Sequence, residues 1–229
     1  MKRLLITLTA LALAAVIGTF AFIWSGAYDI SVTGQHLQPV YRLLEKTMHQ
    51  SVKLRARDTA VPDDLGGAQR FERGAACYRA KCESCHGGPG VAPDDMGRSM
   101  QPLPGPLVDA APRWSEAELH WIVRDGIKMS GMPAWRFRMS DDDIWSVVAF
   151  LERLPRITPA DYRALPSREC DRQAEPALAP DAPADAARGR LALHQYACTA
   201  CHVIPGVTGA DVHVGPPLAG ITWQAVQAY

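Results

Sequence analysis

The sequence has no excess of charge of either sign. Its 24 lysine and arginine residues balance 24 aspartate and glutamate residues, so the formal net charge is +0. Proteins that bind nucleic acid usually carry a basic surface, and this balance therefore gives no indication of a nucleic-acid partner. The sequence also lacks the βαβ pattern that a thioredoxin-like redox site requires. Its 229 residues, 48% of them hydrophobic, are sufficient for one or two small packed domains.

Only six cysteines are present, and four of them belong to a repeated pentapeptide. Residues 82–86 read Cys-Glu-Ser-Cys-His, and residues 198–202 read Cys-Thr-Ala-Cys-His. C-x-x-C-H is the attachment signature of c-type haem, because two thiols at this spacing can each add to one porphyrin vinyl group. The next residue is then held beneath the iron as its proximal ligand. Zinc also binds C-x-x-C pairs, but a histidine directly after each second cysteine favours haem. The predicted attachment residues are Cys82, Cys85, Cys198 and Cys201, and the predicted proximal ligands are His86 and His202.

Cys77 and Cys170 lie outside both motifs. In an oxidising compartment they could form a disulfide with each other. Cys77 could equally be a small core residue on the helix that precedes the first motif. The sequence leaves both interpretations open.

One long hydrophobic run occurs, from Leu4 to Trp24, and it contains no charged residue. It is long enough for a membrane-spanning helix, which needs about 20 residues. Lys2 and Arg3 would keep the N-terminus in the cytoplasm and place the rest of the chain on the periplasmic side of the inner membrane. We therefore predict that residues 1–27 are a retained transmembrane anchor. A cleaved signal peptide is the alternative, although the run exceeds the usual length of a signal-peptide core.

Residues 28–66 contain no haem motif and are predicted to be a juxtamembrane helical segment. The helix is expected from Leu37 to Arg57, with Pro39 tolerated in its first turn. Its outer face is basic, which suggests a collar on the membrane or against a partner subunit. The alternative is an amphipathic helix packed on the chain's own haem domain.

Residues 67–156 are predicted to be the first haem domain. A helix from Ala68 to Ala80 leads into the first motif, and Gly74 would allow another helix to approach it closely. A second helix begins at Ser115, where Glu118 completes a capping box. Ser140 caps a final helix from Asp141 to Leu154, which we expect to cross the first helix near Gly74. The stretch from Gly87 to Pro112 is rich in glycine and proline and is expected to be loop.

A distal iron ligand is predicted between the last two of these helices. Met132 is followed by Pro133, which restricts the backbone and would present the sulfur from an irregular loop. Met129 is the rival candidate, three residues earlier.

Residues 157–186 are rich in proline and alanine and are predicted to be a linker. From residue 187 the pattern of the first domain restarts, so residues 187–229 are predicted to be a partial second domain. No methionine follows Met139, and the second motif therefore lacks the expected sulfur ligand. A truncated or frameshifted reading frame would explain this. The alternative is an iron that is five-coordinate or takes His213.

Cys82, Cys85, His86 and Met132, with the run Gly-Met-Pro-Ala-Trp at 131–135, resemble the class I cytochrome c domain. This resemblance covers residues 67–154, and residues 1–154 resemble membrane-anchored bacterial c-type cytochromes. The second motif suggests a dihaem member of that group. The resemblance implies an all-α fold, His/Met ligation of iron and electron transfer. Residues 215–220 resemble the family's G-P-x-L-x-G loop, in which a proline carbonyl accepts the N–H of the proximal histidine.

The resemblance predicts an electron carrier, not an enzyme, with two covalently bound c-type haems, one at each motif. Its expected partners are redox proteins: a dehydrogenase, the quinol-oxidising complex or a terminal oxidase. Residues 4–24 would contact the inner membrane. The alternatives are the cytochrome subunit of a dehydrogenase or oxidase, and a peroxidase-like dihaem enzyme with an open second haem.

Overall fold

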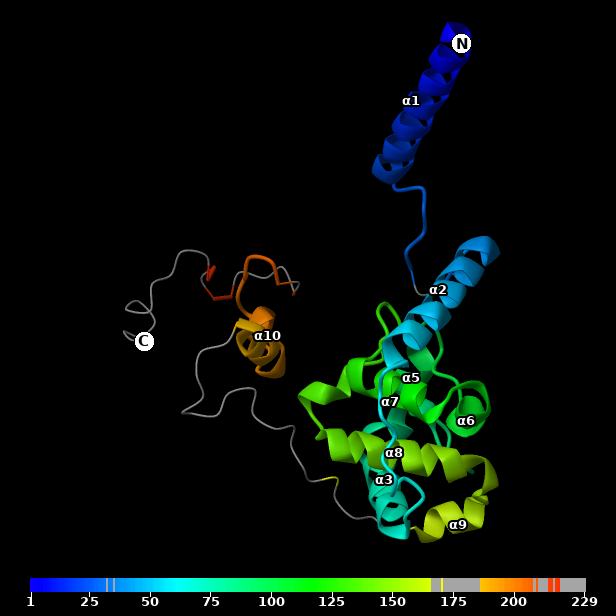
Figure 1. The fold of residues 1–229 in the computed structure, drawn as a ribbon, viewed down its shortest axis with the longest axis vertical. Coiled ribbons are helices and arrows are strands. Elements are labelled where there is room, and N and C mark those ends of the chain that lie inside the picture. Colours follow the sequence, from blue (N-terminus) through cyan, green and yellow to red (C-terminus); the bar gives the residue numbers. More distant parts are fainter. Residues whose placement is uncertain are drawn as a thin grey trace.

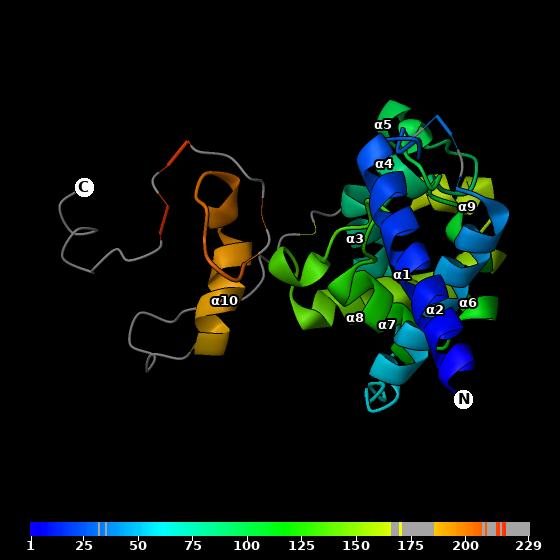
Figure 2. The ribbon, with the colours of Figure 1, turned by 90° about the horizontal axis from the view of Figure 1, so that it is seen from above.

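The structure is a computed structural model that describes residues 1–31, 33–34, 36–165, 170, 186–207, 209, 214–215 and 217–218. These residues form helices and contain no β-strand. A long helix, α1, projects away from a compact helical domain (Figure 1), and α10 lies to one side of that domain in both views (Figures 1 and 2). The predicted all-α class is thus confirmed.

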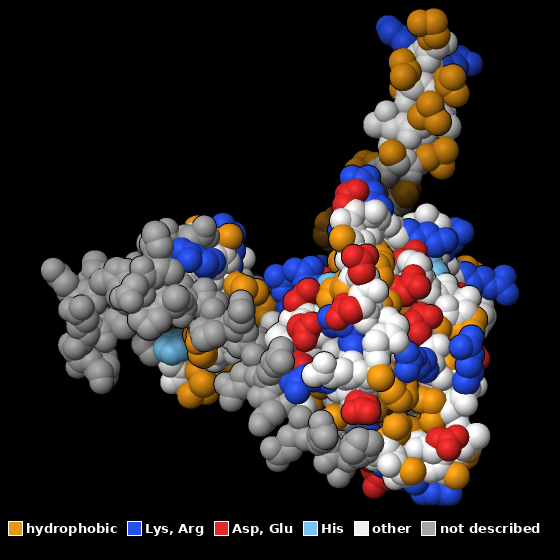
Figure 3. Space-filling model, turned by 60° about the horizontal axis from the view of Figure 1, so that its bottom comes forward, with side chains coloured by type: hydrophobic (Ala, Val, Ile, Leu, Met, Phe, Trp, Pro, Cys, Tyr) orange, Lys and Arg blue, Asp and Glu red, His pale blue; other side chains and the backbone are white. Residues whose placement is uncertain are grey.

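Helix α1 (Lys2–Ser25) buries none of its residues. Among the described residues it is the one helix long and apolar enough to cross a membrane, with a mean hydropathy of 2.3. Hydrophobic side chains cover its visible face (Figure 3). The helix ends at Gly26, which adopts the left-handed conformation that favours glycine. Its length and composition suit a membrane anchor and equally a signal sequence.

Helix α2 (Gln38–Ala56) forms in the juxtamembrane segment and packs in part on the chain's own domain. Its C-terminal half packs on the domain, where Val52 and Ala56 are buried and the His49 ring stacks on Trp114 at 4.3 Å. In its N-terminal half Tyr41 and Leu44 are each 46% exposed. The helix is therefore docked on its own domain by one half only, and an apolar surface remains uncovered on the half nearer α1.

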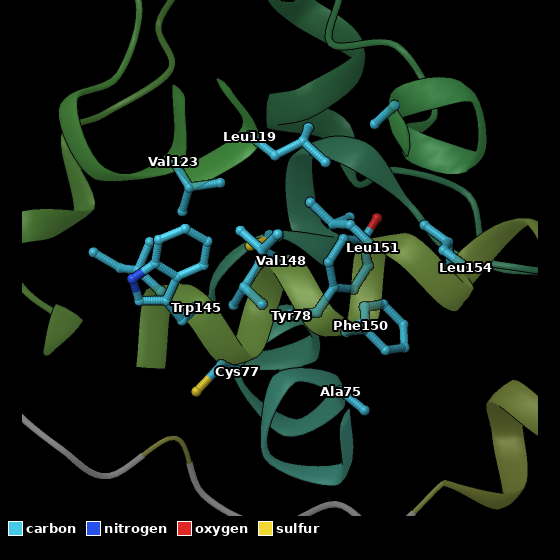
Figure 4. Packing of buried hydrophobic residues seen from close by; sticks show 14 of the residues in the cluster. Ala75, Cys77, Tyr78, Leu119, Val123, Trp145, Val148, Phe150, Leu151 and Leu154 are labelled. Atoms are coloured by element: carbon cyan, nitrogen blue, oxygen red, sulfur yellow. The ribbon is translucent and has the colours of Figure 1, made fainter. Parts of the chain in front are cut away.

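The domain is built on a crossing of α3 (Ala68–Lys81) and α8 (Asp141–Arg153). A Cβ atom on Gly74 would lie 1.8 Å from the carbonyl oxygen of Ser146, so the two backbones touch at this point. Figure 4 shows the core side chains of both helices, with those of α7 (Glu116–Asp125), gathered around the crossing. The predicted crossing at Gly74 is confirmed.

Polar contacts fix the ends of these helices as the sequence predicts. Ser115 and Glu118 form the complete capping box of α7. The Ser140 hydroxyl accepts a hydrogen bond from the backbone N–H of Asp143 at the start of α8. The Asp143 side chain is fully buried and pairs with Arg73 of α3, which joins the capped end of α8 to the partner helix.

Short helices connect the long ones. The stretch predicted as loop, 87–112, contains α5 (Asp95–Ser99), the 3-10 helix η1 (Leu107–Asp109) and the start of α6 (Ala110–Arg113). Asp94 caps α5 by accepting from the backbone N–H of Gly97, which explains why a helical turn forms in a glycine- and proline-rich stretch. The remaining short elements are α4 (Glu83–His86), η2 (Trp135–Phe137) and η3 (Leu154–Arg156).

The segment predicted as linker begins with helix α9 (Pro159–Ala164) rather than with extended chain. Thr158 caps it and Pro159 occupies its first turn, both favourable at a helix N-terminus. Tyr162 is fully buried against the domain. Cys170 forms a disulfide with Cys77 of α3, so the pairing that the sequence left open is present.

The second motif follows α10 (Ala186–Gln195) and begins with η4 (Cys198–Ala200). The rings of His194 and Phe137 stack with centroids 5.6 Å apart, and Arg138 donates a hydrogen bond to the carbonyl of Gln195. Helix α10 therefore contacts η2 of the first domain. Residues 166–169, 171–185 and 219–229, together with His213 and Pro216, lie outside the described residues.

The close contact at Gly74 predicts a large loss of stability for G74A. The added methyl group would meet backbone atoms of Ser146, which cannot turn aside, so we expect unfolding to be easier by at least about 2 kcal/mol. Gly189 follows Arg188 as Gly74 follows Arg73, and a Cβ there would meet nothing within 4 Å. G189A is therefore the matched control, expected to be neutral or to stabilise α10 by up to about 1 kcal/mol. Denaturant unfolding followed by tryptophan fluorescence measures both, and equal effects would contradict the crossing.

Candidate haem site

The first C-x-x-C-H motif forms one helical turn at the end of α3. The backbone N–H of Cys82 donates to the carbonyl of Tyr78, and the N–H of His86 donates to the carbonyl of Cys82. This turn places Cys82 and Cys85 three residues apart on one side of the helix. Neither cysteine forms a disulfide. Burial raises the pKa of Cys82 to about 12, so its thiol is protonated in the free polypeptide.

The His86 ring is held by one backbone contact. Its Nδ1 atom lies 2.9 Å from the carbonyl oxygen of Gly105. Since a carbonyl only accepts, Nδ1 carries the proton and Nε2 keeps the lone pair that a metal binds. Burial lowers the pKa of His86, and the bond to Gly105 offsets this in part. The ring is therefore kept neutral and oriented, which is what a proximal ligand requires.

A cavity of about 350 Å³ opens beside His86. Arg98 is the charged residue on its wall, and the remaining lining is mostly apolar: Tyr78, Gly88, Pro89, Val91, Pro93, Leu103, Pro104, Pro106, Leu107, Val108 and Leu154. An apolar wall with one oriented imidazole and two thiols in the adjacent turn fits the chemistry of a covalently attached porphyrin.

The loop from Gly126 to Pro133 separates the two candidate distal ligands. Met129 has a positive φ of 60° and is 85% exposed. Met132 is half-buried, and its carbonyl accepts from the backbone N–H of Ile127 at 3.2 Å. Met132 is not among the residues that line the cavity beside His86. The geometry favours Met132 over Met129, and the identity of the distal ligand stays a prediction.

Met100 and Gly105 are two residues of this site that the sequence does not single out. A Cβ atom on Gly131 would lie 2.2 Å from the methyl group of Met100, so Met100 connects the 87–112 stretch to the distal loop. No sequence pattern marks Met100. The sequence does contain a signal for Gly105, because Gly-Pro at 105–106 matches Gly-Pro at 215–216 in the predicted second domain.

The second motif shows part of the same arrangement. The backbone N–H of Gly215 donates to the carbonyl of Cys201 at 2.8 Å. A Cβ atom on Gly215 would lie 2.4 Å from the His202 ring, so the loop packs directly on the predicted proximal ligand. Cys198 and Cys201 form no disulfide. Each of the predicted attachment residues and His202 is thus described, whereas the candidate ligand His213 is not.

The structure gives no support to zinc. Zinc sites in proteins are built from four ligands, usually cysteine and histidine. Within the described parts of the chain, no three His, Cys, Asp or Glu side chains come together as a metal site would need. Each motif offers its thiols and one imidazole in the order that haem attachment uses.

Comparison with known families supports this assignment. Residues 69–151 match the family described as cytochrome C oxidase, cbb3-type, subunit III. The matched range contains the first motif and the distal loop, and it ends before the second motif. No curated protein and no solved structure matches the chain. Residues 69–151 are therefore similar to a c-type cytochrome domain, a class whose members bind haem c covalently and transfer electrons.

The predicted thioether ligand can be tested with the two methionines of the distal loop. M132A should abolish the sulfur-to-iron charge-transfer band of the ferric protein and lower its reduction potential, because methionine ligation raises the potential. M129A is the matched control and should leave both unchanged, since its side chain faces solvent. Optical spectroscopy and redox titration measure the two effects. Loss of the band in M129A alone would assign the sulfur ligand to Met129.

Proposed function

We propose that the protein is a membrane-anchored dihaem cytochrome c that carries single electrons between redox proteins on the periplasmic side of the inner membrane. The observation that carries the proposal is the His86 site. A neutral imidazole, oriented by the Gly105 carbonyl, stands beside an apolar cavity, with two free thiols in the adjoining helical turn. The match of residues 69–151 to a cytochrome c family supports the same function.

The chain's own residues have defined parts in this proposal. The Cys82 and Cys85 thiols would hold the haem, each by adding its S–H across one vinyl double bond to give a thioether, without a net change in oxidation state. His86 would hold the iron through Nε2 and Met132 through its sulfur. The bound haem supplies a one-electron couple. An iron held by both residues would change little in geometry when its charge changes, and this would favour fast electron transfer rather than catalysis.

The partner is proposed to be a membrane-bound redox complex. The matched family is named as a subunit of a cbb3-type cytochrome c oxidase, which makes a terminal oxidase the first partner to test. A dehydrogenase or the quinol-oxidising complex would occupy the other side of the electron path. Whether the chain is a free-standing carrier or an oxidase or dehydrogenase subunit is decided by co-purification.

A second haem is proposed at Cys198, Cys201 and His202. The contact of α10 with η2 supports electron exchange between the two sites, because it joins the helix before the second motif to the segment that follows Met132. We propose that this haem extends the relay. The competing role, a peroxidase-like reaction, needs an iron with an open position.

Carbon monoxide binding by the reduced protein distinguishes, at each site, a haem that only transfers electrons from a haem whose iron is open for catalysis. We expect two haems per chain, and we expect C198A/C201A to hold one haem that does not bind carbon monoxide. A haem with both axial positions occupied resists the ligand, whereas an open iron takes it up. Stoichiometric binding by C198A/C201A would contradict the relay at the first site. Binding by half the haems of the parent chain would assign an open iron to the second site and favour the peroxidase alternative there.

Replacement of residues 2–25 by a cleavable secretion leader tests the anchor. The parent chain should stay in the membrane fraction after an alkaline wash. An α1 helix that spans the lipid bilayer is held by its hydrophobic side chains, and a change of pH does not release it. The leader variant should be found in the soluble fraction with its haem attached. A soluble parent chain that begins near residue 26 would identify the segment as a signal peptide.

A further inference from the structure

A segment after α8 covers the first haem motif from outside. We define it as the strap: residues 158–165 with Cys170. Its helix, α9, is short and lies at the edge of the domain, yet Tyr162 within it is fully buried. A Cβ atom on Gly90 would lie 2.9 Å from Pro159, so the strap rests directly on the turn that follows His86.

Tyr162 contacts the motif in two ways. A Cβ atom on Gly88 would lie 2.6 Å from the tyrosine ring, so the ring fills the space that a side chain at Gly88 would need. The phenol donates a hydrogen bond to the carboxylate of Glu83, which stands between the two attachment cysteines. The strap therefore reaches into the C-x-x-C-H turn itself.

The charges around this contact are few. The Arg79 guanidinium lies 5.1 Å from the centre of the Tyr162 ring, and its Nε atom is 4.0 Å from Glu83. Arg79 also donates to the carbonyl of Leu165 at 2.7 Å, which ties α3 to the end of the strap. Burial raises the pKa of Tyr162, and the hydrogen bond to Glu83 raises it further. The phenol therefore stays protonated near neutral pH and acts only as a donor to Glu83.

The disulfide tethers the far end of the strap. Cys77 and Cys170 are 93 residues apart in the sequence, and Cys77 lies in α3 one turn before the motif. The strap is thus attached to α3, the helix that leads into the first motif, at Leu165 by a hydrogen bond and at Cys170 by a covalent bond. These two attachments on the C-terminal side of Tyr162 hold the tyrosine against Glu83.

We propose that Tyr162 is a positioning residue of the first haem site, which it serves by fixing Glu83 and withdrawing part of that carboxylate's negative charge. The proposal rests on the proposed function, since it requires haem at Cys82 and Cys85. A negative charge beside the haem stabilises the oxidised form, which carries one more positive charge than the reduced form. The hydrogen bond from Tyr162 weakens that effect and therefore raises the reduction potential of the first haem.

The test uses C198A/C201A in the full chain, so that only the first haem titrates. Y162F keeps the ring and removes the hydroxyl, and it should lower the reduction potential. E83Q removes the charge and should raise it. In the E83Q background there is no carboxylate for the Tyr162 hydroxyl to act on, so adding Y162F should leave the potential equal to that of E83Q. Y41F, at an exposed tyrosine of α2, is the matched control and should change nothing.

Reduction potentials that shift in opposite directions in Y162F and E83Q distinguish this electrostatic role from a role in packing alone. An unchanged potential in Y162F, with haem attached, would overturn the proposal and leave the proposed function intact. E83Q retains every strap contact except the charge, so an unchanged potential there would also overturn it, even if Y162F fails to fold. A parent chain with no haem at Cys82 and Cys85 would overturn the proposed function as well.

Discussion

The approach of α3 to α8 at Gly74 is the constraint on which the domain depends. The backbones touch because position 74 has no side chain, and the Arg73–Asp143 pair fixes the rotation of one helix on the other. The end of α3 then determines where the Cys82–His86 turn begins. The end of α8 determines where η3 and α9 return to cover that turn. Both sides of the motif are thus positioned by one crossing.

The site itself depends on a few single contacts between segments that have little regular structure. The Gly105 carbonyl orients His86 from a stretch of short helices and turns, and Met100 connects the same stretch to Gly131 beside Met132. The strap adds a third support through Tyr162. Irregular segments can adopt many conformations when free, so the closure of a loop at both ends is what gives such contacts a fixed geometry. Here α3, α7 and α8 provide those fixed ends.

Much of this could be predicted from sequence patterns with a physical cause. The capping box of α7, the cap of α8 and the glycine at the crossing are local signals, and each appears where expected. Helix α9 was missed because a proline- and alanine-rich composition suggests a linker, whereas burial of Tyr162 stabilises a helix there. The pairing of Cys77 with Cys170 depends on a distance across 93 residues that no local pattern contains. Gly105 was missed because it follows its histidine at a different spacing from Gly215.

The central claim is that residues 82–86 hold a covalent haem. Mass spectrometry of proteolytic peptides from the protein, produced in a host that attaches c-type haem, tests it directly. The account predicts that the peptide containing Cys82 and Cys85 carries the mass of one haem with no free thiol, while Cys77 is recovered in disulfide linkage to Cys170. Recovery of Cys82 and Cys85 as free thiols, or paired with Cys77, would contradict it.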